Sequence, residues 1–123
     1  MSVLRSLFGS KPTGMTDLVP ALEAWEASSY PNDEYPPGSD GGEVAGVDLA
    51  LLAGDVAAVL DCAIRGRWDR LPEGDTILRH VIPAIEKVLP ELSPIGVAYF
   101  GPTLPLLIEV QRRRTLLAEA PST

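Results

Sequence analysis

VDLALLAGDVAAVLDCAIR, residues 47–65, is the stretch that decides the fold of this 123-residue chain. Its apolar residues recur at alternating intervals of three and four, which places one buried stripe along a helix. The stripe consists of Leu49, Leu52, Val56, Val59 and Ala63, and it is widened by Leu51, Leu60 and Ile64. Gly66 follows at the position where glycine commonly ends a helix. We therefore predict a central helix over residues 47–65.

Helical signals also precede and follow this central helix. They cover residues 16–29, 76–92, 93–100 and 103–120. Thr16, Ser93 and Thr103 each stand where a hydroxyl can cap a first helical turn. Pro83 lies inside the 76–92 pattern and is expected to kink or split that helix, because proline removes a backbone donor. No run alternates apolar and polar residues between hairpin turns, so no strand is predicted.

Residues 30–46, YPNDEYPPGSDGGEVAG, carry four carboxylates, three prolines, four glycines and no positive charge. Such a composition indicates a connector without regular structure. The predicted fold class is therefore all-α: a compact bundle of four to five helices with one long acidic Gly/Pro-rich loop. We expect one helical domain over residues 1–123, with an N-terminal segment at 1–15 and the long loop at 30–46.

Charge is unevenly distributed along the chain, whose net charge is −7. Residues 12–64 contain ten acidic residues and neither Lys nor Arg, whereas residues 62–123 contain eight basic and seven acidic residues. A nucleic-acid partner is not expected, because phosphate binding requires clustered cations. The arginines near residues 65–70 and 112–114 are predicted to pair with carboxylates of the acidic half. An acidic surface either keeps the protein in solution or attracts a basic partner.

The long loop has three interpretations: a simple linker, a partner-binding loop or a metal site. Its carboxylates do not follow the spacing of a calcium-binding loop, so no metal site is predicted. Tyrosines beside carboxylates suit a basic partner, because tyrosine is enriched at binding hot spots. The candidate partner-binding residues are Tyr30, Asp33, Glu34, Tyr35, Asp40 and Glu43, together with Phe8 of the N-terminal segment.

The N-terminal segment places Val3, Leu4, Leu7 and Phe8 on one side of a short amphipathic turn. This pattern is typical of a segment that docks into a partner groove or lies on a membrane. No secretory leader is recognised, and residues 92–108, although uncharged, contain three prolines and are expected in the core rather than in a bilayer. The single cysteine, Cys62, excludes an internal disulfide and favours a cytoplasmic location.

Catalysis would have to use Cys62 and the only histidine, His80, as nucleophile and base. An apolar helical setting is more typical of a buried structural thiol, so neither an enzyme nor a cofactor is predicted. The function that the sequence favours is a small acidic module that binds a basic protein, as an inhibitor or immunity-type protein does. The alternatives are an adaptor or assembly subunit that uses the apolar N-terminal segment and, less favoured, an enzyme built on Cys62 and His80.

Overall fold

The computed structural model of the chain describes residues 15–36 and 42–119. Four helices form the bundle: α2 (Val19–Glu26), α3 (Leu49–Ile64), α4 (Gly74–Val88) and α6 (Thr103–Glu119). The short helix α5 (Pro94–Phe100) leads into α6, and single 3-10 turns form η1 (Thr16–Leu18), η3 (Trp68–Arg70) and η4 (Leu89–Glu91). A small hairpin of β1 (Glu43–Val44) and β2 (Val47–Asp48) precedes α3. The fold is thus mostly helical, as predicted, with a two-stranded addition.

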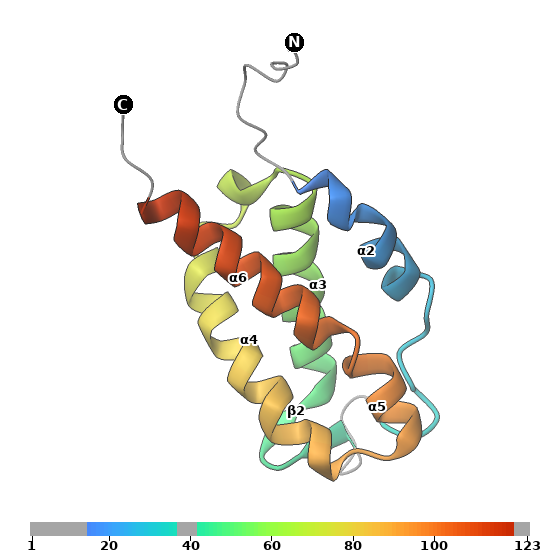
Figure 1. Cartoon of the computed structure of the whole chain (residues 1–123). Coiled ribbons are helices and arrows are strands. Elements are labelled where there is room, and N and C mark those ends of the chain that lie inside the picture. Colours follow the sequence, from blue (N-terminus) through green and yellow to red (C-terminus); the bar gives the residue numbers. More distant parts are fainter. Residues whose placement is uncertain (1–14, 37–41, 120–123) are drawn as a thin grey trace.

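Helix α3 is central, because α2, α4 and α6 all pack against it (Figure 1). The predicted stripe is confirmed: Leu49, Leu52, Val56, Val59 and Ala63 are all buried, and so are Leu60 and Ile64. Leu51 was expected to widen the stripe, but it is 66% exposed. The helix begins at Leu49 rather than at 47, because the carboxylate of Asp48 caps it by accepting from the backbone N–H of Leu51 at 3.0 Å.

The hairpin corrects the expectation that the chain forms no strand. Val44 pairs with Val47 and Glu43 with Asp48 in an antiparallel register. The intervening Ala45 and Gly46 both have positive φ, at 53° and 81°. Two such residues in succession match a turn whose twist suits a hairpin. The 30–46 stretch is therefore structured at its C-terminal end.

Helix α4 continues through Pro83, so of the predicted kink or split the split is wrong, and the kink stays a prediction. Proline removes the donor to the carbonyl of Arg79, four residues earlier. Both Pro83 and Arg79 are exposed, so water can satisfy that carbonyl. The buried face of α4 lies on the other side and is formed by Leu78, Val81, Ile82, Ile85 and Val88.

The predicted caps have different outcomes. Ser93 caps α5, because its hydroxyl accepts from the backbone N–H of Gly96 at 3.2 Å. Thr16 makes no capping hydrogen bond, and the chain there forms η1 before α2 begins. Thr103 is fully buried and its hydroxyl donates to the carbonyl of Phe100 at 2.6 Å, so it joins α5 to α6.

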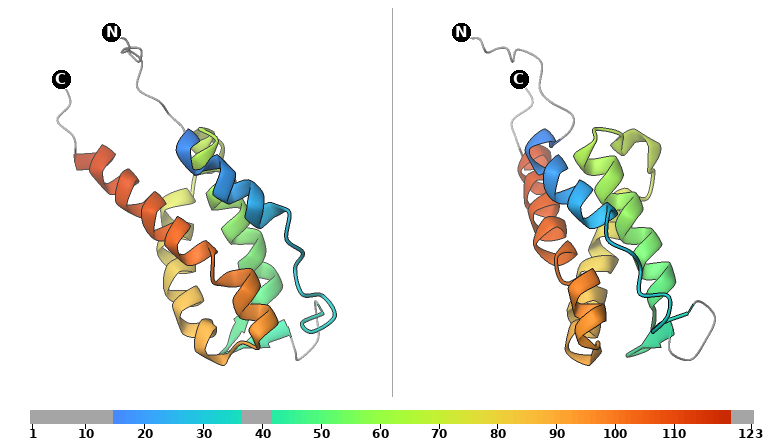
Figure 2. Two further views of the ribbon diagram at one scale, coloured as in Figure 1. Left: turned by 45° about the vertical axis from the view of Figure 1, so that its right-hand side comes forward. Right: turned by 90° about the vertical axis from the view of Figure 1, so that its right-hand side faces the viewer.

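Two ends of the bundle can be distinguished. The hairpin, the end of α4 and the start of α5 lie at one end, whereas η3, the start of α2 and the C-terminal half of α6 lie at the other (Figures 1 and 2). Among the described helices, none has the length and apolar character needed to cross a bilayer.

Candidate functional site

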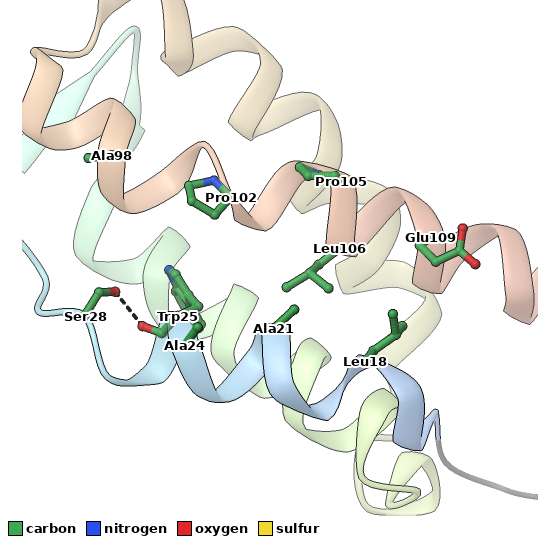
Figure 3. Close-up of a pocket in the computed structure, with 10 residues that line it drawn as sticks. All are labelled: Leu18, Ala21, Ala24, Trp25, Ser28, Ala98, Pro102, Pro105, Leu106 and Glu109. Carbon is green, nitrogen blue, oxygen red and sulfur yellow. Dashed lines mark hydrogen bonds between the residues drawn. The ribbon is translucent and has the colours of Figure 1, made fainter.

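An apolar groove of about 570 Å³ separates α2 from α5 and α6 (Figure 3). The α2 side is formed by Leu18, Ala21, Ala24, Trp25 and Ser28, which are the residues of one helical face. Three of these five side chains are small. The helix therefore presents little bulk towards α6, and the space between the two helices is not filled.

The opposite side of the groove comes from α5 and α6. It is formed by Ala98, Pro102, Pro105, Leu106 and Glu109. The indole N–H of Trp25 donates to the carbonyl of Tyr99 at 3.0 Å, which holds the end of α2 against α5. Two prolines and an alanine leave this wall shallow and almost without polar groups.

An ion-pair cluster lies beside the groove near the start of α2. The Arg113 guanidinium contacts Asp17 at 2.7 Å and Glu109 at 2.6 Å, so it joins η1 to α6. Hydrogen bonds from Arg112 and Arg113 lower the pKa of Glu109 to about 2. The hydrogen bond from Arg113 likewise lowers the pKa of Asp17. Asp17 is exposed and Glu109 is half-buried, so each pair contributes little, although together they join the two helices.

Arg65 and Arg114 also form ion pairs, and both lie away from the hairpin. Arg65 binds Glu26 at 2.7 Å and Asp61 at 2.6 Å. Arg114 binds Asp75 at 2.9 Å and stacks 4.0 Å above the ring of Trp68. The predicted pairing of the basic and acidic halves is confirmed for Arg65 with Glu26 and for Arg113 with Asp17, whereas Arg114 pairs within its own half.

The carboxylates at the hairpin end have a different environment. We call Asp33, Glu34, Glu43, Asp48 and Glu91 the acidic end. Among the residues that the structure describes, these five form no ion pair with Lys or Arg. Asp48 serves as the cap of α3, and Asp33 and Glu43 are exposed. Five carboxylates without an ion-pair partner therefore share this end of the bundle, and the described residues Glu23, Asp55, Asp69, Glu73 and Glu86 also form no ion pair elsewhere on the surface.

A shallow pocket of about 410 Å³ lies at the acidic end. It is lined by residues 29–34 and by Ile95 of α5. Ile95 is 59% exposed, so a large apolar side chain lies beside Asp33 and Glu34. An apolar centre with a charged rim is the usual anatomy of a protein interface.

Tyr35 corrects our expectation of an exposed aromatic grip, whereas Tyr30 is half-buried and lines the pocket at the acidic end. Tyr35 is 8% exposed, and its hydroxyl donates to Ser93 Oγ at 3.1 Å and accepts from the Ser93 N–H at 3.0 Å. Tyr30 packs edge-on against Tyr99, with ring centroids 5.6 Å apart. Its hydroxyl is buried without a partner in the described part of the chain, and burial raises its pKa. Both rings attach the connector to α5.

Two predicted partner-binding residues, Phe8 and Asp40, lie outside the described residues. Asp33 and Glu34 line one pocket and Glu43 lies in the hairpin, and their role in binding a partner stays a prediction. Sequence reasoning missed Ile95 and the α2–α6 groove. The sequence signal for Ile95 was its place in the first turn of a helix, directly after the cap Ser93 and Pro94. The groove depends on the tertiary spacing of two helices, which no local pattern reveals.

Cys62 and His80 are not brought together. His80 is exposed beside Asp55 in a pocket of about 150 Å³ between α3 and α4. Cys62 is half-buried and lies seven residues beyond Asp55 on α3, a separation of about 10 Å along the helix axis. Within residues 15–36 and 42–117, no three potential ligand side chains gather around one metal position.

Comparison of the chain with protein-family models, with curated proteins and with solved structures finds no match.

Proposed function

We propose that this protein is a cytoplasmic, non-catalytic binding module that captures a basic protein partner at its acidic end. One observation supports this most strongly. Arginines neutralise Asp17, Glu26 and Asp75, whereas Asp33, Glu34 and Glu43 form no ion pair among the described residues. Paired charges attract little at a distance, and unpaired ones steer a cationic partner towards the surface that carries them.

Ile95 gives this surface an apolar centre. Charge alone accelerates association but supplies little affinity in salt, because a Debye length of about 8 Å screens exposed charges. A partner that places an apolar side chain on Ile95 and basic side chains near Asp33 and Glu34 would use both contributions. Inhibitors and immunity-type proteins that block cationic enzymes use such surfaces, and the proposed role belongs to that class.

The test is capture of proteins from a lysate of the cells that make this chain, with elution by a salt gradient. The variant Asp33→Lys with Glu43→Lys should lose the captured basic protein at low salt. The matched control, Asp69→Lys with Glu73→Lys, changes net charge equally but at the arginine-rich end, where both residues are exposed. It should capture as the wild type does.

Ile95→Ala separates the two contributions. It should lower the salt concentration at which the partner elutes by weakening affinity, while the dependence of binding on salt keeps its slope. Equal losses from the acidic-end variant and its control would refute the proposal, because only net charge would then matter. Retention of the partner by Asp33→Lys with Glu43→Lys would refute it as well.

A further inference from the structure

The α2–α6 groove is an apolar surface with no side chain of the described bundle inside it. Ala21 and Ala24 on one wall and Ala98 on the other leave its volume of about 570 Å³ open (Figure 3). The groove is a separate surface from the acidic end, and nothing below depends on the function proposed above.

The described chain begins beside one end of this groove. The backbone N–H of Met15 donates to the carbonyl of Ile64 at 2.8 Å, which fixes the point where the chain enters the bundle. Leu18, three residues later, already lines the groove. The start of the described chain therefore lies close to the Leu18 end of the groove.

We propose that residues 3–8 of the same chain occupy the α2–α6 groove. VLRSLF carries Val3, Leu4, Leu7 and Phe8, whose spacing gives one apolar face when helical. The wall of the groove from Leu18 to Ser28 is about 15 Å long, and the six residues 3–8 span about 9 Å as a helix. The intervening GSKPTG, residues 9–14, can bridge up to about 20 Å. The segment therefore fits within the length of the groove, and the tether is long enough to place it there.

The tether favours this occupant over a second copy of the chain. A short linker holds its segment at an effective concentration in the millimolar range near the groove. A second copy would have to exceed that concentration to compete. An apolar helix from a partner would face the same competition, so residues 3–8 would act as an internal cover that a partner must displace.

Trypsin can test the proposal, because Arg5 lies inside the segment and the Arg5–Ser6 bond must enter the protease to be cut. The full chain is digested at low micromolar concentration, and release of residues 1–5 is followed by mass spectrometry. Ala24→Glu places a carboxylate in the groove and should speed this cleavage at least tenfold. Ala57→Glu, a substitution of another exposed helical alanine on α3, is the matched control and should cleave as the wild type does.

Phe8→Ser alters the segment and leaves the described bundle intact, so it should speed cleavage even if Ala24→Glu impairs folding. Cleavage rates within twofold for wild type, Ala24→Glu and Phe8→Ser would overturn the proposal and leave the groove to another occupant. Protection that disappears on dilution would also overturn it, because the segment would then bind a second copy.

Discussion

Tyr35 gives the sharpest test of the packing described above. Its hydroxyl makes two hydrogen bonds with Ser93, at 3.1 and 3.0 Å, and these join the 30–46 stretch to the cap of α5. Tyr35→Phe removes both bonds and leaves the Ser93 N–H without its partner. One net hydrogen bond is worth about 1 kcal/mol, so the loss of both bonds in this partly buried setting costs about 2 kcal/mol. We therefore expect a loss of about 2 kcal/mol in the free energy of unfolding.

The assay is urea unfolding followed by circular dichroism, with a thermal scan beside it. With a slope of about 2 kcal/mol/M, the urea midpoint should fall by about 1 M. The Tm should fall by roughly 6–10 °C for a chain of this size.

Tyr30→Phe is the matched control from the same stretch. The Tyr30 hydroxyl is buried and has no partner among the described residues, so its removal relieves a desolvation cost. This variant should be as stable as the wild type or more stable. A Tyr35→Phe variant within about 0.5 kcal/mol of the wild type, or equal losses in the two variants, would refute the assigned contacts.

Three further substitutions test packing and charge. Gly74→Ala should lower stability by about 1–3 kcal/mol, because its Cβ would lie 2.5 Å from the Trp68 ring; unchanged urea unfolding would contradict this. Gly54→Ala should raise stability by about 0.5–1 kcal/mol, since its Cβ meets nothing within 4 Å in mid-helix, and a lower Tm would count against it. The pKa of Glu109 is about 2 instead of 4.5. The ion pairs of Glu109 therefore add to the free energy of unfolding above pH 4.5, and this contribution is lost as the pH falls towards 2. Glu109→Gln should therefore lose less stability over that interval in thermal scans at each pH, and an unchanged pH profile would contradict the pairing.

The central helix could be predicted because its periodicity is local and strong. Seven of the eight apolar residues predicted to be buried on this helix are buried. The exception, Leu51, lies at the edge of the stripe, where a small rotation of the helix about its axis decides whether a side chain is buried. The split at Pro83 was wrongly predicted because the cost of a proline depends on which face of the helix it occupies, and tertiary packing sets that face.

The acidic end could be predicted only in part. The sequence identified Asp33, Glu34 and Glu43 as one charged region, but it placed both tyrosines on the surface. Tyr35 is buried because of Ser93, 58 residues later, and no local pattern encodes such a contact. The hairpin was missed because its turn uses Ala45, whereas asparagine, aspartate or glycine would have been the usual signal for positive φ.

Asp48 belongs to two elements at once: its backbone pairs with Glu43 in the hairpin, and its carboxylate caps α3 at Leu51. The two cannot open independently, because a hairpin that frays carries the cap away from the helix. Hydrogen exchange at the Leu51 amide thus reports the opening of the strands before it, and the hairpin with the first turn of α3 forms one cooperative unit of local unfolding.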